Sequence, residues 1–296
     1  MVALAPRAEI ERALLAHEDA LDWDPGIVIA GSETAQDRPD DWQLEAWLER
    51  QPSARDRAAL DALFDRAQEW RAEQLPATDW LTHSQRDLAP IRAGRFYVHT
   101  PYQPASDDDA TIDFAIPASQ AFGTGQHATT AGCLAMLTSI KASGAVVRNC
   151  ADIGTGSGLL AFAVLKLWPR ALAIASDIDP VCAGVVIDNA QHNGVAIGGG
   201  AGELAVTVAA GLDHPLLLGR APYDLVIANI LAGPLIELMP AFAGVTAPGT
   251  HLLLAGLLTS QEAPVLRAAT RHGFRLARRE VRGDWSILWL RRRAAR

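Results

Sequence analysis

Apolar residues in the C-terminal part of the chain form short runs, separated by segments whose apolar positions have helical spacing. From residue 128 the two patterns alternate, which predicts strands and helices in turn. The predicted strands are 146–153, 172–177, 203–209, 223–229, 249–255, 274–282 and 285–291. The predicted helices are 129–141, 158–168, 180–193, 232–243 and 260–272. Because such alternation is typical of parallel sheets covered on both faces, we expect an α/β domain that ends in a hairpin at Gly283-Asp284.

The N-terminal third has a different order of elements. Residues 7–21 have helical spacing, 26–30 and 42–48 read as strands, and Ser53 is a candidate cap for a helix that runs to about residue 70. The order α-β-β-α is most of a ferredoxin-like α+β sandwich, and residues 2–4 could be a stub of its first strand. This segment therefore predicts a small separate domain.

Between these regions, residues 72–92 contain isolated prolines and read as a connector. Residues 95–99 and 111–116 are predicted strands on either side of the acidic turn 107–109. We therefore divide the chain into a small N-terminal domain, a connector that carries a strand pair, and a cofactor-binding domain. Their predicted ranges are 1–75, 76–118 and 119–296.

Composition narrows the class of protein. The chain is 49% hydrophobic and 20% charged, which is typical of a globular protein, and no apolar run reaches the ~18 residues that span a membrane. The first residues lack the pattern of a signal peptide, so we expect a cytoplasmic protein. A net charge of −8 favours a basic partner over a nucleic acid. Cys133, Cys150 and Cys182 lie in apolar segments without metal-ligand spacing, so we expect buried thiols and no zinc site.

The strongest candidate for chemistry is the run Asp152-Ile153-Gly154-Thr155-Gly156-Ser157-Gly158, between a predicted strand and a predicted helix. Glycines at this place let the backbone turn tightly and approach a ligand, although a tight turn without a ligand is the alternative. The spacing is G-x-G-x-G and departs from the dinucleotide pattern at Leu159. This departure favours S-adenosylmethionine over NAD, because a pyrophosphate needs a free helix N-terminus.

Two polar residues follow the neighbouring predicted strands. Asp177 ends the strand 172–177, where a carboxylate can accept hydrogen bonds from ribose hydroxyls. Asp179, before Pro180, is better explained as a helix cap. Asn229 ends the strand 223–229, where its amide oxygen could accept a hydrogen bond from a substrate amine. The alternative for Asn229 is that it caps the helix that begins near residue 232.

A second glycine-rich segment, residues 121–130, precedes the first helix of the alternating region. It lacks the lysine of a phosphate-binding P-loop. His127 could act as a base there, or could organise its loop.

Five runs together resemble one family. They are AFGTGQHATT at 121–130, DIGTGSGLLA at 152–161, SDIDP at 176–180, DNAQHNGV at 188–195 and YDLVIANILAGPLIEL at 223–238. Residues 80–296 are similar to the PrmA family, the bacterial methyltransferases of ribosomal protein L11. The resemblance implies a seven-stranded, Rossmann-like class I methyltransferase domain with a small ferredoxin-like domain that docks the substrate. It also implies S-adenosylmethionine contacts at Thr130, Gly154, Asp177 and Asn229, to which the glycine-rich run adds Gly156.

The activity that the resemblance implies is N-methylation of ribosomal protein L11, on lysine ε-amines and the N-terminal α-amine. We expect the enzyme to be a monomer. Asn229, with the carbonyl of Ile230, is the candidate group that orients the amine. The first alternative is a methyltransferase for a protein glutamine, a small amine or RNA. Glutamine enzymes carry Asn-Pro-Pro-Tyr where this chain has Asn229-Ile230-Leu231-Ala232. The second alternative is a non-catalytic protein that binds the cofactor.

Overall fold

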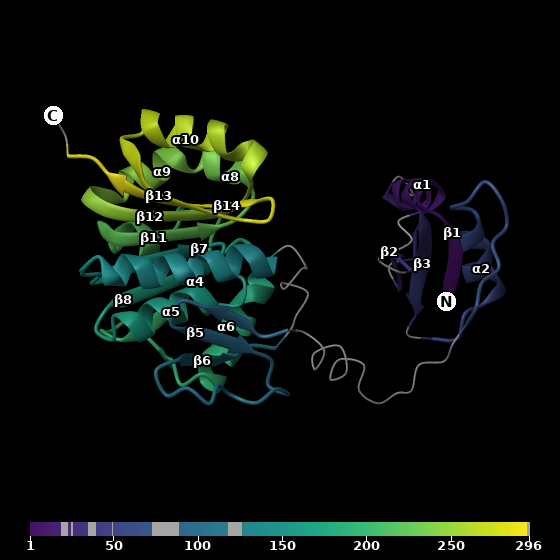
Figure 1. Cartoon of the computed structure of the whole chain (residues 1–296), viewed down its shortest axis with the longest axis horizontal. Helices are drawn as coiled ribbons and strands as arrows, with labels where there is room; N and C mark the ends of the chain where they lie inside the picture. The colour runs from purple at the N-terminus through teal and green to yellow at the C-terminus, as the bar shows by residue number, and fades with distance from the viewer. Residues whose placement is uncertain are drawn as a thin grey trace. The chain divides into compact units, whose positions relative to one another are not determined.

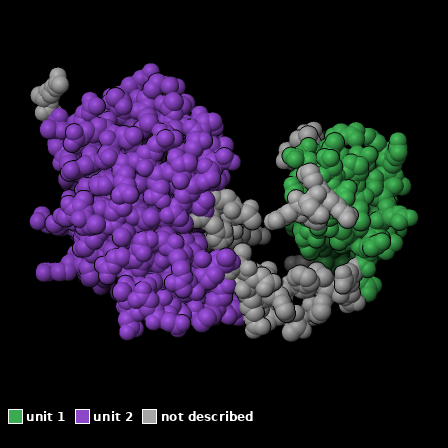
Figure 2. All heavy atoms as spheres, in the orientation of Figure 1, with its two compact units in different colours: residues 1–80 green, residues 81–296 purple. Residues whose placement is uncertain are grey.

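The computed structural model describes residues 1–18, 23–24, 26–34, 40–48, 50–72, 89–117 and 126–294. The chain forms two compact units, residues 1–80 and 81–296, which we describe separately (Figure 2). In the described part of the chain, no helix is long and apolar enough to cross a membrane.

The first unit is a three-stranded antiparallel sheet with helices on one face. Its elements are β1 (Val2–Pro6), α1 (Arg7–Glu18), β2 (Ile27–Glu33), β3 (Asp41–Leu48) and α2 (Ala54–Asp61). The strand order is β1-β3-β2, and on its other side β1 makes a single antiparallel bridge from Val2 to Arg71. This is the ferredoxin-like order. The first strand is complete, not a stub, and within residues 50–72 the last strand is represented by the bridge at Arg71 alone.

The helix α2 begins as predicted but ends early. Ser53 caps it, and the backbone N–H of Ser53 donates to the Asp56 carboxylate in return. The helix ends at Asp61, not near residue 70. The Asp61 carboxylate accepts hydrogen bonds from the Gln68 N–H and, over 2.8 Å, from the Trp70 indole. These bonds fold the chain back at the point where a longer helix would run on.

The two faces of this sheet differ sharply. On the helix face, Leu44 and Ala46 of β3 pack against α1 and α2. The other face carries Leu4, Val28 and Trp47, which are 59%, 60% and 40% exposed. Side chains alternate along a strand, so these apolar residues share a face that no described element of this unit covers. The first unit therefore has a core of its own and an open apolar face.

The second unit is built on an eight-stranded sheet (Figure 1). The strands are β7 (Asn149–Ile153), β8 (Leu172–Asp177), β9 (Ala196–Ile197), β10 (Glu203–Val208), β11 (Tyr223–Asn229), β12 (Thr246–Leu258), β13 (Phe274–Arg282) and β14 (Trp285–Arg292). Their order is β13-β14-β12-β11-β7-β8-β10-β9. All neighbours pair in parallel except at β14, which is antiparallel to both β12 and β13. The predicted fold class and terminal hairpin are confirmed.

Helices cover both faces of this sheet. They are α4 (Gln126–Ala142), α5 (Leu159–Leu167), α6 (Pro180–His192), α7 (Pro215–Gly219), α8 (Ala232–Glu237), α9 (Met239–Gly244), a 3-10 turn η1 (Thr259–Gln261) and α10 (Glu262–Arg271). Along β11, Leu225 and Ile227 join the core under α4 and α5, while Val226 and Ala228 join the core under α8 to α10. Burial on both faces explains why the strand is continuously apolar.

A small sheet of β4 (Ile91–Ala93), β5 (Phe96–His99) and β6 (Ile112–Ala115) also belongs to the second unit. Phe96 and Phe114 lie in the same core as α4 and α5. Thus the strand pair predicted as part of a connector is part of the larger unit, and β4 was not predicted at all.

Two other predictions differ in detail. The helix expected at 232–243 is two short helices, α8 and α9. Pro240 lacks the N–H that would bond to the carbonyl of Ile236 in a continuous helix. Cys133 and Cys150 are buried as expected, whereas Cys182 is only half-buried.

Candidate functional site

The candidate residues on β7, β8 and β11 meet at one edge of the sheet. β7 lies between β8 and β11, and Ile153 is in register with Ser176 on one side and with Ala228 on the other. Gly154, Asp177 and Asn229 come one residue later on each strand, at the carboxyl edge where open parallel sheets bind ligands.

The glycine-rich turn after β7 needs its glycines for two different reasons. Gly154 and Gly156 have φ of 71° and 55°, in the left-handed region. A Cβ on Gly154 would lie 2.3 Å from Cγ2 of Ile230, so Gly154 allows the turn to pack against the segment after β11. A Cβ on Gly156 would have no atom within 4 Å. The space beside the turn is therefore filled at Gly154 and open at Gly156.

Asp177 holds the glycine-rich turn in place. Its Oδ2 accepts from the Gly156 N–H over 2.9 Å, and its Oδ1 accepts from the Asp179 N–H over 3.1 Å. The carboxylate is half-buried and also accepts a hydrogen bond from the Cys182 thiol, which leaves it room for a further donor. Asp179 caps α6 by accepting from the Val181 N–H, as predicted.

Asp152, to which the sequence analysis gave no separate role, is a buried carboxyl group beneath the turn. Its Oδ2 accepts from the Thr155 hydroxyl over 2.7 Å and from the Ala161 N–H over 3.2 Å. Its Oδ1 is buried and has no partner among the described residues. Burial raises the pKa of Asp152 to about 6, against the two hydrogen bonds, which lower it. An acidic residue in an apolar strand directly before G-x-G-x-G was the signal for it.

Asn229 is half-buried at the end of β11 and is not a helix cap. The N-cap of α8 is Leu231, and no side chain caps this helix. The Asn229 side chain makes no hydrogen bond to any described residue. Close by, Gly256 has φ of 82°, and a Cβ there would lie 2.4 Å from the carbonyl oxygen of Ile230. Tight packing against β12 therefore fixes the backbone that follows Asn229.

Two exposed apolar side chains border this edge. Ile178 follows Asp177 and is 71% exposed, and Leu231 lies two residues after Asn229 and is 70% exposed. Exposed apolar groups beside a polar site are typical of ligand contacts. The sequence carries no separate signal for them, because an apolar residue directly after β8, or two residues after β11, looks like a continuation of the strand.

Thr130 is buried in the first part of α4, at 8% exposure. Gly132, two residues later, packs against Ile287. Ile287 lies near the start of β14, which pairs with Leu257 and Leu258 at the C-terminal end of β12. Thr130 is thus near the carboxyl edge of the sheet, where the other candidate residues lie. It makes no described hydrogen bond to them. The predicted loop residues 121–125 and the side chain of His127 lie outside the described residues.

The comparison with protein families identifies the chain. The model of the family "Ribosomal protein L11 methyltransferase (PrmA)" matches residues 18–293. The chain belongs to this family.

Individual relatives agree with the assignment. The chain is 37% identical over 291 residues to the ribosomal protein L11 methyltransferase of Brucella suis (strain ATCC 23445 / NCTC 10510), covering 97% of both chains. It is 39% identical over 260 residues to that of Rhizobium meliloti (strain 1021), covering 86% of this chain and 87% of the relative. A crystal structure of ribosomal protein L11 methylase from Lactobacillus delbrueckii subsp. bulgaricus matches with a TM-score of 0.56 and 27% identity. That match covers 70% of this chain and 98% of the other.

Proposed function

We propose that this protein transfers methyl groups from S-adenosylmethionine to amines of ribosomal protein L11, on lysine side chains and the N-terminal α-amine. The observation that carries the proposal is the cluster at the carboxyl edge of the sheet, where Asp177 and Asn229 lie on either side of the glycine-rich turn. We further propose that the enzyme works as a cytoplasmic monomer.

The residues at this edge fit the cofactor. The open space at Gly156 would receive it, and the Asp177 carboxylate would accept a hydrogen bond from its ribose. Asp152 has a buried oxygen without a described partner, and Ile178 offers an apolar surface to the adenine. When bound, S-adenosylmethionine supplies an activated methyl group on a sulfonium sulfur. Gly154, by contrast, makes room for the side chain of Ile230.

Asn229 would orient the amine. A neutral amine has one lone pair for the reaction and N–H groups to donate, and the Asn229 amide oxygen can accept one of them. The Ile230 carbonyl, held by its close packing at Gly256, would accept another. An α-amine with a pKa of about 8 is neutral more often than a lysine with a pKa of about 10.4. Removing the lysine from water at the apolar Leu231 lowers its pKa and favours the reactive form.

The first unit would dock the basic substrate. Residues 1–80 contain 18 Asp and Glu against 8 Arg and no Lys. The open face of its sheet combines exposed Val28 and Trp47, which pair across the strands, with Glu45. An aromatic anchor beside a carboxylate, in a unit with an excess of acidic residues, suits a basic protein. Trp42, on the same strand as Trp47, is half-buried on the helix face beneath the Arg7 guanidinium and does not belong to this open face.

The test is to incubate the purified chain with S-adenosylmethionine and free L11 and to weigh the product by mass spectrometry. We expect mass increments of whole methyl groups, located on amines by peptide mapping, and none with Asn229→Ala over the same time. L11 of unchanged mass, or methyl groups that map to glutamine and not to amines, would overturn the proposal.

A further inference from the structure

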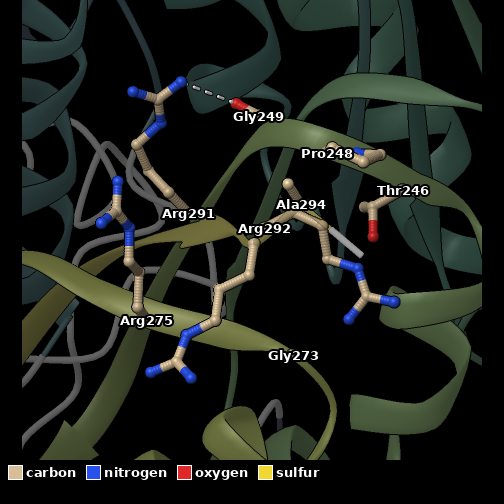
Figure 3. A pocket seen from close by; sticks show the side chains of 9 residues that line it. Thr246, Pro248, Gly249, Gly273, Arg275, Arg291, Arg292 and Ala294 are labelled. Atoms are coloured by element: carbon tan, nitrogen blue, oxygen red, sulfur yellow. Dashed lines mark hydrogen bonds between the residues drawn. The ribbon is translucent and has the colours of Figure 1, made fainter. Parts of the chain in front are cut away.

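Four arginines surround a cavity at the opposite edge of the large sheet. Arg275, Arg291, Arg292 and Arg293, here called the arginine cluster, line a cavity of about 910 Å³ together with Thr246, Pro248, Gly249, Gly273 and Ala294 (Figure 3). The cavity lies where β12 and β13 begin and β14 ends. Gly249 and Ala255 are six residues apart along β12, or about 20 Å, so the cluster is remote from Asn229, the partner of Ala255.

Two of the arginines are neighbours across paired strands. Arg275 and Arg291 are direct partners in the antiparallel pair β13–β14, and their side chains extend in the same direction in Figure 3. Like charges in this position repel. No carboxylate of the described residues forms an ion pair with any member of the cluster. An anion between the two guanidiniums would remove the repulsion.

Arg291 is also partly held in place. Its Nη2 donates to the Gly249 carbonyl over 3.2 Å, while its Nε is buried and has no partner among the described residues. A buried donor without an acceptor is costly, and a bound anion would satisfy it. The burial and the fixed Nη2 make Arg291 a preorganised half of a binding site.

The cluster is wider than one small anion. Arg292 extends in the opposite direction to Arg275 and Arg291 (Figure 3), over the ring of Phe274 at 5.1 Å. A Cβ on Gly273 would lie 2.5 Å from Nη1 of Arg292, so this glycine makes room for the side chain. Guanidiniums on both sides of the strand end suit a ligand with several separated negative charges.

The net charge of the whole chain gives no sign of the arginine cluster. Residues 81–296 contain 18 Lys and Arg against 16 Asp and Glu, so the negative charge resides in residues 1–80. The expectation that the protein avoids nucleic acid rested on the total of −8. A local cluster of one sign is the better guide to a polyanion site.

We propose that the arginine cluster binds the phosphate groups of single-stranded RNA. Guanidinium forks bind phosphate oxygens in pairs, and an RNA strand presents phosphates in succession, so one strand can engage several members. The choice of RNA among polyanions rests on the proposed function, since a ribosomal protein substrate is found with RNA. Binding itself needs neither S-adenosylmethionine nor L11.

The test uses the full chain and a fluorescein-labelled oligouridylate of about 20 nucleotides, longer than one protein site. Fluorescence anisotropy gives Kd between about 50 and 200 mM KCl. The double variant R275Q/R293Q removes two exposed side chains that have no described hydrogen bond. We expect Kd to rise about tenfold at low salt and the slope of log Kd against log salt to fall by about 1.4, at ~0.7 per lost phosphate contact.

The matched control is R55Q/R57Q, which removes the same charge from two exposed positions on α2 and should leave Kd within about twofold. Equal Kd for R275Q/R293Q and the parent would overturn the proposal. So would displacement of the RNA by polyglutamate of equal charge, or by inorganic phosphate at the same concentration of phosphate groups. R291Q, checked for folding by circular dichroism, should weaken binding further. Methylation of free L11 by R275Q/R293Q tests the proposed function separately, and we expect it to be unchanged.

Discussion

The side chain of Ile230 occupies the space beside Gly154, where a Cβ atom on Gly154 would lie only 2.3 Å from Cγ2 of Ile230. The turn after β7 and the segment after β11, which the sequence suggested for cofactor and amine respectively, are therefore packed against each other. A shift in one moves the other. The contact couples the two halves of the proposed reaction, and it separates the roles of two glycines that look equivalent in G-x-G-x-G.

Gly156→Ala should weaken S-adenosylmethionine binding by roughly tenfold or more, which is ~1.4 kcal/mol, because the new methyl group enters the open space of the cradle. Isothermal titration calorimetry gives the affinity. The matched control is Gly283→Ala, since Gly283 has φ of 56° against 55° for Gly156 and also has open space around it. Both variants should lose about 1 kcal/mol of stability, and only Gly156→Ala should lose affinity. If Gly156→Ala bound S-adenosylmethionine as tightly as the parent, the cofactor would not occupy the space beside Gly156.

Asn229→Ala should lower kcat about a hundredfold and leave the Kd of S-adenosylmethionine within about threefold, because its proposed role is to orient the amine. The melting temperature should hardly change, since the Asn229 side chain has no hydrogen bond to a described residue. Steady-state kinetics with L11, with calorimetry and a thermal melt beside them, measures all three. A kcat within threefold of the parent would give the orienting role to another group.

Asp152→Asn should change how stability depends on pH. The folded protein holds the pKa of Asp152 at about 6, above its ordinary 3.8, so ionisation opposes folding. The parent should therefore lose stability relative to Asp152→Asn as pH rises from about 4 to about 6, by up to about 3 kcal/mol, and the difference should then stay constant. Urea unfolding at several pH values measures it. Asp213→Asn, at an exposed position, controls for the loss of one charge. A difference that is flat across this range would contradict the burial argument.

Trp47→Ala should raise the KM for L11 at least fivefold, about 1 kcal/mol, and leave the slow methylation of a short lysine peptide unchanged. Trp47 lies on the open face of the first unit, far along the chain from every site residue. Tyr102→Ala, an exposed aromatic residue of the second unit, is the control. Deletion of residues 1–80 should have the larger effect of the same kind, because the second unit has its own cores. Equal losses on protein and peptide would mean that the first unit supports the fold and does not dock the substrate.

The sequence predicted those elements whose limits are set locally. The strands 172–177 and 223–229 have the predicted bounds because each apolar run ends in a polar residue, Asp177 or Asn229. The end of α2 could not be predicted, since it depends on the bond from Trp70 to Asp61 across nine positions. Gly154, Asp177 and Asn229 were candidates because of their places at the ends of predicted strands, and the structure brings them to one edge of the sheet. The different surroundings of Gly154 and Gly156 could not be predicted, because Ile230, which packs against Gly154, is 76 positions away in the sequence.

The unequal sharing of charge between the two units has a kinetic consequence. A basic protein that diffuses toward the enzyme is drawn to residues 1–80, which carry the excess of 18 acidic over 8 basic residues. This long-range attraction accelerates encounter without adding a contact, and salt screens it over about 8 Å at physiological ionic strength. The association rate constant for L11 should therefore fall steeply with ionic strength, while the rate of dissociation and the transfer of the methyl group change little. The acidic unit would thus attract the substrate at long range before it binds it.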